Sequence, residues 1–291
     1  MERIVRSSRA MRPLVSRFMP GETIDDVLLA IRSLRAQNTP TIITFLGENV
    51  TSDAAADQTV AEYERLLAAL KAEGSDTHVS IKLTQFGWDV DQARALERVR
   101  RLTRLAAQQN AILAIDIESS DYAESTVAGY ETLLREFTNS ALCLQAYLHR
   151  TPGDLQRLLP LKPFIRLVKG AYREPATVAL QRREDISARY RVLGRELLSV
   201  TAQGTRVAFG THDMTLIAQL RQDARVLGVP DRAYEVQMLY GIQEAGRRAL
   251  AADGVPVRVL ISYGKAWYPW FMRRLAEKPA NLMLIPRNLF S

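Results

Sequence analysis

Cysteine is nearly absent from this chain, which has one, Cys143, among 291 residues. A lone thiol cannot form an internal disulfide, so nothing in the sequence points to an oxidising compartment. Cys143 lies in the apolar run 141–144, and we expect it to be a buried strand residue without a redox role. The three histidines, His78, His149 and His212, show no metal-ligand spacing with one another or with the cysteine.

Long apolar runs are also missing. No stretch reaches the roughly 18 consecutive apolar residues of a transmembrane helix, and no signal-peptide core follows the arginine-rich start of the chain. The net charge of +7 is spread along the sequence with acidic residues interleaved, and the clusters of aromatic and basic residues typical of RNA-recognition strands are absent. We therefore expect a cytoplasmic protein, soluble or peripheral on the inner face of a membrane, that does not bind nucleic acid.

Short apolar or β-branched segments alternate along the chain with longer segments of helical periodicity. The candidate strands are residues 41–46, 79–83, 112–117, 141–148, 164–168, 206–209, 234–238 and 257–261. The candidate helices are residues 53–71, 89–108, 120–137, 152–159, 183–200, 214–225 and 242–252. Several of these helices begin after Asp or Ser, which cap first turns. The alternation, without a Gly/Ser/Pro-rich linker, predicts an α/β protein with one closed (β/α)₈ barrel, a TIM barrel.

An open doubly wound sheet is the alternative architecture. Such sheets usually carry phosphate-binding glycines after the first strand, whereas residues 45–49 contain only Gly47. A further amphipathic helix at 24–34 precedes the first strand, and we expect it to close the barrel floor. The expected organisation is an N-terminal helical extension, residues 1–38, followed by the barrel, residues 39–291.

Polar residues concentrate at the ends of the expected strands, and barrels of this kind carry their catalytic groups at the carboxyl ends. They are Lys82, Thr84, Gln85, Asp116, Glu118, Gln145, Tyr147, Arg166, Lys169, Tyr172, His212, Asp213, Glu235, Gln237 and Tyr263. Any one of them is open to a structural interpretation as part of a buried ion pair. Because a buried charge is costly unless it is paired or used, the whole set predicts a functional site at this end of the barrel.

A second concentration of such residues follows the last strand, in the segment 263–277. The neighbouring Arg273 and Arg274 have guanidinium groups suited to bidentate binding of a carboxylate or a phosphate. Glu277 lies one helical turn further on. A solvent-facing charged helix is the simpler alternative, but two tryptophans and a tyrosine beside the arginines favour a walled pocket.

Seven segments of the sequence resemble, in the same order, the proline dehydrogenase family of flavin enzymes, which also forms the first catalytic domain of proline utilization A. They are residues 80–84, 115–118, 144–148, 166–172, 210–212, 236–241 and 273–277. Each segment is weak evidence alone, and their combination is specific. The resemblance implies a distorted (β/α)₈ barrel with FAD lying across the carboxyl ends of the strands.

The resemblance also implies substrate-binding roles. Arg273 and Arg274 are similar to the pair that binds the carboxylate of L-proline, with Lys82 as a further cationic partner. Asp116 is similar to the carboxylate that holds Lys82 and shapes the pocket. Tyr172 and Leu239, by the same resemblance, pack on the proline ring.

The flavin site implied by the resemblance involves more of the chain. Arg166 is similar to an arginine near the flavin N5, and with Lys82 and Asp116 it completes the candidate catalytic residues. The positions similar to FAD-contacting residues are Gln145, Arg166, Val168, Lys169, Gly170, Ala171, Thr211, His212, Gln237 and Glu277. No metal is implied.

Strand eight departs from the family pattern. The family often carries a pocket tyrosine there, and Leu260 stands at the nearest aligned position. Tyr263 and Tyr268 are the candidates to supply the missing hydroxyl.

The activity implied by the resemblance is FAD-dependent oxidation of L-proline to Δ¹-pyrroline-5-carboxylate, with electrons passed to a membrane quinone during transient membrane association. Because no aldehyde-dehydrogenase module is present, a separate pyrroline-5-carboxylate dehydrogenase is expected downstream. Two alternatives remain from the residues alone. One is a Schiff-base barrel lyase with Lys82 or Lys169 as nucleophile, and the other is a basic, non-enzymatic module that binds nucleic acid.

Overall fold

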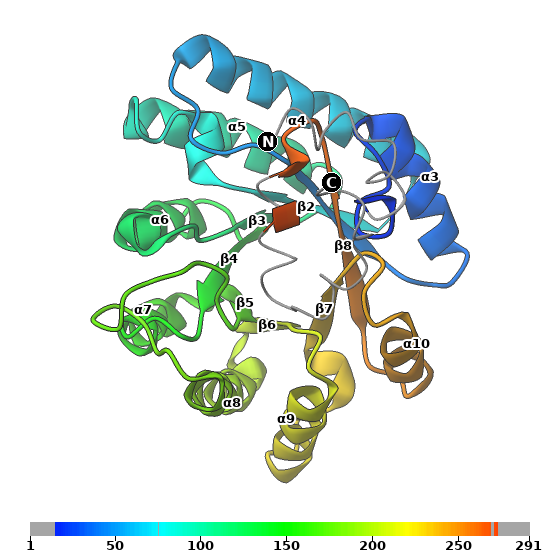
Figure 1. Ribbon diagram of the computed structural model, residues 1–291, viewed down its shortest axis with the longest axis vertical. Coiled ribbons are helices and arrows are strands. Elements are labelled where there is room, and N and C mark those ends of the chain that lie inside the picture. Colours follow the sequence, from blue (N-terminus) through cyan, green and yellow to red (C-terminus); the bar gives the residue numbers. More distant parts are fainter. Residues whose placement is uncertain (1–14, 75, 269–270, 273–291) are drawn as a thin grey trace, which may run out of the picture.

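Eight parallel strands form a closed barrel in which each strand pairs with the next one along the chain (Figure 1). They are β1 (Thr41–Phe45), β2 (Thr77–Ile81), β3 (Leu113–Ile115), β4 (Ser140–Gln145), β5 (Phe164–Val168), β6 (Arg206–Gly210), β7 (Glu235–Leu239) and β8 (Val257–Tyr263). Pairing of β8 with β1, which sets Ser262 beside Thr44, closes the barrel. The computed structural model describes residues 15–74, 76–268 and 271–272. The predicted (β/α)₈ barrel and its eight strands are confirmed.

Eight α-helices of the described residues surround the strands. They are α3 (Ile24–Arg35), α4 (Asp53–Glu73), α5 (Gln92–Ala107), α6 (Ser120–Leu134), α7 (Thr151–Leu158), α8 (Arg183–Ser199), α9 (Met214–Val226) and α10 (Glu244–Ala252). The short 3₁₀ helices η1 (Leu83–Phe86), η2 (Leu159–Leu161), η3 (Thr201–Gln203) and η4 (Asp231–Ala233) lie in the connections. Asp91 and Asp213 cap α5 and α9 by accepting hydrogen bonds from the amides of Arg94 and Leu216.

The helix α3 does not lie where the sequence predicted. Figure 1 shows it in the outer ring between α4 and α10, and it contacts α4 and β8. Its apolar face, which includes Val27 and Ile31, is buried in the layer between helices and strands. The prediction that this helix closes the barrel floor is therefore wrong. It fills the place in the ring that a helix after β8 takes in a regular (β/α)₈ order.

The chain after β8 follows a different course from the other connections. Gly264 turns it with a φ of +116°, and a Cβ there would lie 2.8 Å from the ring of Phe45. Beyond the turn, the chain joins residues that precede α3 in an apolar cluster made of Val15, Phe18, Met19, Leu46, Trp267 and Phe271. In Figure 1 this orange-to-red segment lies inside the ring of helices. Both ends of the described chain thus meet at the end of β1 that Leu46 follows.

Side chains on each strand alternate between the barrel interior and the surrounding helices. The apolar interior consists of Ile42, Ile112, Ala114, Ala141, Phe164, Ala208 and Leu260. Because Ser80 pairs with Ala114, Lys82 and Asp116 follow two positions further toward the carboxyl ends of the strands, which we call the mouth. Cys143 is buried on β4, and burial raises the pKa of its thiol to about 12. It is the buried strand residue that the sequence predicted.

Candidate active site

Asp116 and Arg166 form an ion pair at the mouth. Arg166 Nη1 donates to Asp116 Oδ1 at 2.9 Å, and the two side chains are 12% and 19% exposed. Burial acts to lower the pKa of the Arg166 guanidinium, but the charge of Asp116, together with smaller contributions, outweighs it and raises that pKa. Arg166 therefore remains a buried cation.

The partner of Asp116 differs from the one that the resemblance implied, which was Lys82. The pairing of β3 with β4 and of β4 with β5 sets Asp116, Cys143 and Arg166 at one level of the barrel. The small side chain of Cys143 leaves room between the other two. Asp116 and Arg166 consequently reach each other across β4.

Arg166 has hydrogen-bonding capacity that the described residues do not use. Its Nε is buried without a partner among them, and the same holds for Oε1 of Gln237 on β7. The Nε2 of Gln237 is occupied, because it donates to Glu235 Oε1 at 2.5 Å. A buried polar atom without a partner costs roughly 1–3 kcal/mol. Inside the barrel, Arg166 Nε and Gln237 Oε1 thus lack a partner among the described residues, as do the hydroxyls of Thr44, Ser80 and Ser262.

Lys82 follows β2 at the point where the chain enters η1, and it is 8% exposed. Its amide donates to Gln85 Oε1 at 2.8 Å. Gln85 Nε2 in turn donates to the carbonyl of Phe45 at 2.7 Å. These bonds tie the ends of β1 and β2 together and fix the backbone that carries the Lys82 ammonium.

Glu118 is a further buried carboxyl group beside this corner, 4% exposed. The hydroxyl of Thr84 donates to its Oε1 at 2.7 Å, and the amide of Thr84 lies 3.4 Å from its Oε2. Burial raises the pKa of Glu118 to about 7, against the opposing effects of Thr84 and Lys82. The sequence placed Glu118 and Thr84 among the strand-end polar residues but assigned them no role. Their occurrence at the ends of neighbouring strands was the signal available.

Gln145 links the loops that follow β3, β4 and β5. Its Nε2 donates to the carbonyl of Glu118 at 2.8 Å, and its Oε1 accepts from the amide of Ala171 at 3.2 Å. The hydroxyl of Thr151 donates to the Gln145 carbonyl. Gln145 therefore sets the relative positions of the residues after β3, β4 and β5.

The residues after β5 pack closely on Tyr147. Gly170 has a φ of +127°, and a Cβ there would lie 2.3 Å from the Tyr147 ring. The Tyr147 hydroxyl donates to the carbonyl of Tyr172 at 3.2 Å. Only glycine fits at position 170, and the close contact fixes the backbone course of the predicted flavin-binding residues 168–171.

Lys169 is fully engaged within the protein. Its Nζ lies 2.8 Å from Asp213 Oδ2 and 2.9 Å from the Ser187 hydroxyl. Asp213 also caps α9, so this contact joins the end of β5 to the start of α9. An ammonium group held in this way is a poor Schiff-base nucleophile.

His212 and Leu239 are connected at the carboxyl ends of β6 and β7. The amide of Leu239 donates to His212 Nε2 at 2.8 Å, so this nitrogen is an acceptor. Thr211, the residue before His212, accepts from the amide of Asp213 at 3.2 Å. Leu239 pairs with Leu260 on β8 and packs against the inner apolar cluster.

The hydroxyl expected from strand eight is not found at Tyr263. That hydroxyl donates to Glu62 Oε1 on α4 at 3.0 Å, so it points into the helix layer. Leu260 faces the barrel interior, and alternation places Ser262 on the same face nearer the mouth. The Ser262 hydroxyl is buried without a partner among the described residues. Tyr268 is partly buried against the cluster that contains Trp267.

The structure brings most of the predicted residues on β2 to β7 together at one end of the barrel. Glu235 is the exception: it begins β7 and pairs with Arg258 at the opposite end, so its prediction as a site residue is wrong. Arg273, Arg274 and Glu277 lie outside the described residues. In the described part of the chain, no group of three or more His, Cys, Asp or Glu side chains is arranged to hold a metal.

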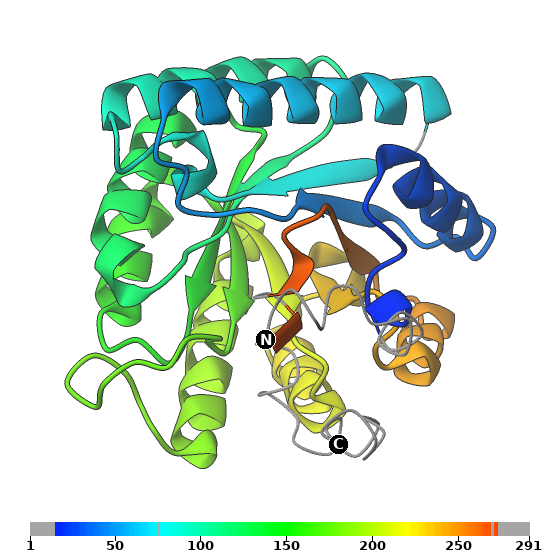
Figure 2. The ribbon, with the colours of Figure 1, turned by 45° about the horizontal axis from the view of Figure 1, so that its top comes forward.

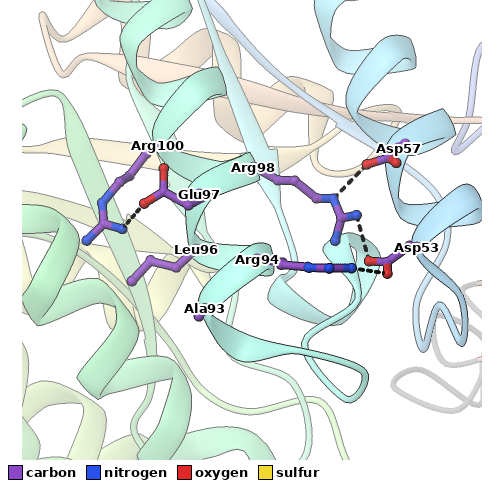
Figure 3. Close-up of a pocket in the computed structure, with 8 residues that line it drawn as sticks. All are labelled: Asp53, Asp57, Ala93, Arg94, Leu96, Glu97, Arg98 and Arg100. Atoms are coloured by element: carbon purple, nitrogen blue, oxygen red, sulfur yellow. Dashed lines mark hydrogen bonds and ion pairs between the residues drawn. The ribbon is translucent and has the colours of Figure 1, made fainter.

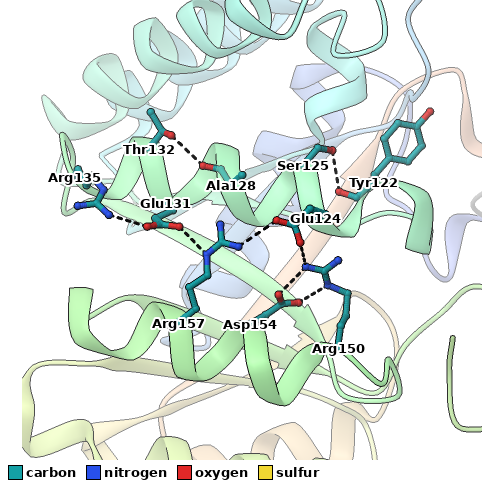
Figure 4. A network of polar contacts seen from close by, with 10 residues as sticks. All are labelled: Tyr122, Glu124, Ser125, Ala128, Glu131, Thr132, Arg135, Arg150, Asp154 and Arg157. Atoms are coloured by element: carbon teal, nitrogen blue, oxygen red, sulfur yellow. Dashed lines mark hydrogen bonds and ion pairs between the residues drawn. The ribbon is translucent and has the colours of Figure 1, made fainter.

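In two networks outside the mouth, charged residues are paired with one another. Residues of α4 and α5 line a groove of about 550 Å³, and Figure 3 shows their charged side chains. The two helices lie side by side (Figure 2). Arg98 there binds both Asp53 and Asp57 at 2.8 Å. Figure 4 shows a similar network between α6 and α7, where Arg157 binds Glu131 at 2.8 Å. Both sets cross-link neighbouring helices and include none of the predicted site residues.

The model of the family described as proline dehydrogenase matches residues 27–285. Proline dehydrogenase 1 of Bacillus subtilis (strain 168) is 33% identical over 274 residues, which cover 94% of this chain and 89% of that protein. Proline dehydrogenase of Deinococcus radiodurans is 34% identical over 281 residues, which cover 95% of this chain and 90% of that protein.

The fold is also similar to that of a longer protein, proline utilization A from Bdellovibrio bacteriovorus inactivated by N-propargylglycine. The TM-score is 0.85 at 23% identity, and the match covers 91% of this chain and 32% of that protein. The structural likeness concerns the barrel alone. The sequence matches go further: the chain belongs to the proline dehydrogenase family and is an enzyme that oxidises proline in proline catabolism.

Proposed function

We propose that this enzyme oxidises L-proline to Δ¹-pyrroline-5-carboxylate by hydride transfer from the ring to N5 of FAD bound at the mouth. The observation that carries the proposal is the buried Arg166–Asp116 pair with an unused Nε on Arg166. The family is flavin-dependent in general, and the mouth offers groups that suit a flavin. Arg166 Nε is a donor and Gln237 Oε1 is an acceptor, and the flavin ring system has edges of both kinds.

The residues assigned to the flavin also provide a close backbone approach. Gly170 and Ala171 follow β5 in a course fixed by Tyr147 and Gln145, and Thr211 and His212 follow β6. With Val168, Lys169, Gln237 and Glu277 these residues form the proposed cofactor site. Bound FAD would supply the two-electron acceptor chemistry that no side chain of the protein has. Arg166 would place a positive charge where negative charge develops.

The proposed substrate site combines cations with apolar walls. Arg273, Arg274 and Lys82 bind the proline carboxylate and align the ring without contacting the reacting carbon. Tyr172 and Leu239 pack on the ring. Neighbouring cations also favour the unprotonated ring nitrogen that the oxidation requires.

The proposed electron acceptor is a membrane quinone, and a separate pyrroline-5-carboxylate dehydrogenase would consume the product. In the described residues, none of the helices is both long and apolar enough to cross a bilayer. We propose transient, peripheral contact with the inner face of the membrane, to which the net charge of +7 contributes.

Anaerobic spectrophotometry tests the proposal directly. The purified protein is expected to show flavin absorption bands that bleach when L-proline is added. A colourless protein that instead traps a carbonyl substrate on borohydride treatment would contradict it in favour of the Schiff-base lyase. Flavin bands that do not bleach with proline would contradict the substrate assignment alone.

A further inference from the structure

Glu118 occupies an unusual position beside the mouth, because its carboxyl group is buried yet is not ion-paired with any described residue. Both of its oxygens face Thr84, at 2.7 Å from the hydroxyl and 3.4 Å from the amide. Its backbone carbonyl accepts from Gln145. The carboxyl group is therefore held in one place by η1 and β4.

Several charged or titratable groups act on Glu118. Lys82 attracts the ionised form, Glu48 after β1 repels it, and Tyr122 on α6 is close enough to be affected by it. The Tyr122 hydroxyl donates to Asp89 at 3.0 Å. Among these groups Lys82 provides the positive charge, and it is two residues from Thr84, which binds Glu118.

Lys82 is also a proposed partner of the substrate carboxylate. Two carboxylates beside one buried ammonium repel each other, and the repulsion is relieved when one of them is protonated. The substrate carboxylate is held by further cations in the proposed site, whereas Glu118 is buried and has no ion-pair partner among the described residues. Glu118 is therefore the group that takes the proton.

We propose that Glu118 is a positioning residue that takes up one proton from water when the carboxylate of the substrate binds beside Lys82. The ionised form places a second negative charge near the Lys82 ammonium and so weakens its attraction for the substrate carboxylate, and the protonated form removes that charge. This inference rests on the proposed function, because it requires an anionic substrate at the mouth. Burial sets the pKa of Glu118 at about 7, so both forms are populated near neutral pH.

The experiment is the pH dependence of KM for L-proline in the FAD-loaded enzyme, compared between the wild type and Glu118→Gln. Glutamine keeps an oxygen that accepts from Thr84 but cannot ionise. Titration of the proline nitrogen affects both enzymes equally, so the ratio of their KM values isolates Glu118. Above the pKa of Glu118, the wild-type KM is expected to rise about tenfold relative to that of Glu118→Gln. A tenfold change corresponds to a shift of about one unit in the pKa of Glu118 on substrate binding. The kcat should change little.

Thr84→Val provides a second, independent variant. It removes the hydroxyl that stabilises the ionised carboxylate, so the rise in KM should move to higher pH instead of disappearing. Thr84→Ser, which keeps the hydroxyl, should restore the wild-type profile. Flavin absorbance and thermal melting would check that each variant is folded and loaded.

Two results would overturn the inference. One is a KM ratio that does not change with pH, and the other is a Thr84→Val profile that coincides with the wild type. If the wild type oxidises proline in either case, the proposed function stands and only the proton uptake is rejected. A wild type that does not reduce its flavin with proline would reject both.

Discussion

Both ends of the barrel carry a buried arginine, and the two are bonded very differently. At the floor, the end opposite the mouth, Arg258 of β8 is 5% exposed. Its Nε lies 3.2 Å from Glu235, and its Nη1 donates to the carbonyl of Thr41 at 3.0 Å and to Asp76 Oδ1 at 3.1 Å. At the mouth, Arg166 donates one hydrogen bond to Asp116, and its Nε has no partner among the described residues.

The difference indicates that Arg258 stabilises the fold, whereas Arg166 is placed to bind a ligand. Arg258 has protein partners on β1, on β7 and ahead of β2, so its hydrogen bonds do not depend on a ligand. Arg166 is nearly as buried, with 12% of its side chain exposed against 7% for Arg258, but its Nε has no partner among the described residues. A ligand at the mouth would supply one. The predictions below test this contrast.

The largest effect is expected from Arg166→Met at the mouth. Loss of a charge that stabilises the transition state should lower kcat for proline by roughly 10²–10³-fold. The melting temperature should fall as well, because Asp116 loses its cation. Arg166→Lys should recover only part of the rate, because lysine keeps the charge but lacks the planar guanidinium. Stopped-flow flavin reduction measures the rate, and a wild-type rate in Arg166→Met would remove Arg166 from the reaction.

Arg258→Met at the floor should lower the stability of the protein without affecting the reaction. It leaves Glu235 without its cation, so the free energy of unfolding should fall by about 3 kcal/mol. The flavin reduction rate per folded molecule should be unchanged. Chemical denaturation and kinetics on the same preparation would show this, and a stable but slow variant would refute the division between the two ends.

The smallest effect concerns His78, also at the floor and buried. Burial, and then Arg258, lower its pKa to about 3. Since this is below the value of about 6.5 in the unfolded chain, the unfolded state binds the extra proton. Stability is therefore lost as the pH falls from about 6.5 toward 3, by roughly 1.4 kcal/mol at pH 5.5.

His78→Gln should remove that part of the pH dependence while other titrating groups keep theirs. Melting temperatures at neutral and acid pH, for the wild type and the variant, would provide the comparison. An identical slope in both proteins would show that His78 does not titrate with folding.

Sequence reasoning predicted the strands because alternation and β-branched runs are local signals. It also predicted that polar residues meet at the mouth, since carboxyl ends of parallel strands share one edge. It misplaced α3, because amphipathic periodicity shows that a helix has a buried face but not which neighbours cover it. The position that α3 occupies in the ring is free because the chain after β8 turns away at Gly264, more than two hundred residues further along the sequence.

The pairing within the site was less predictable. The choice of Arg166 over Lys82 as partner of Asp116 depends on register and on the small Cys143 between them. Glu118 was not assigned a role because its importance arises from burial and from Thr84, which no spacing reveals. Gly170 was expected at the cofactor site, but its contact with Tyr147 required the three-dimensional packing.

The place of α3 in the ring has a consequence for the order of folding. This helix is synthesised before any strand, yet it packs against β8, which is synthesised last. Contacts so distant in sequence form slowly, and domains fold as their residues emerge during synthesis. The growing chain must keep the apolar face of α3 from aggregating until β8 is available. Closure of the barrel waits for the same strand, because β8 must pair with β1.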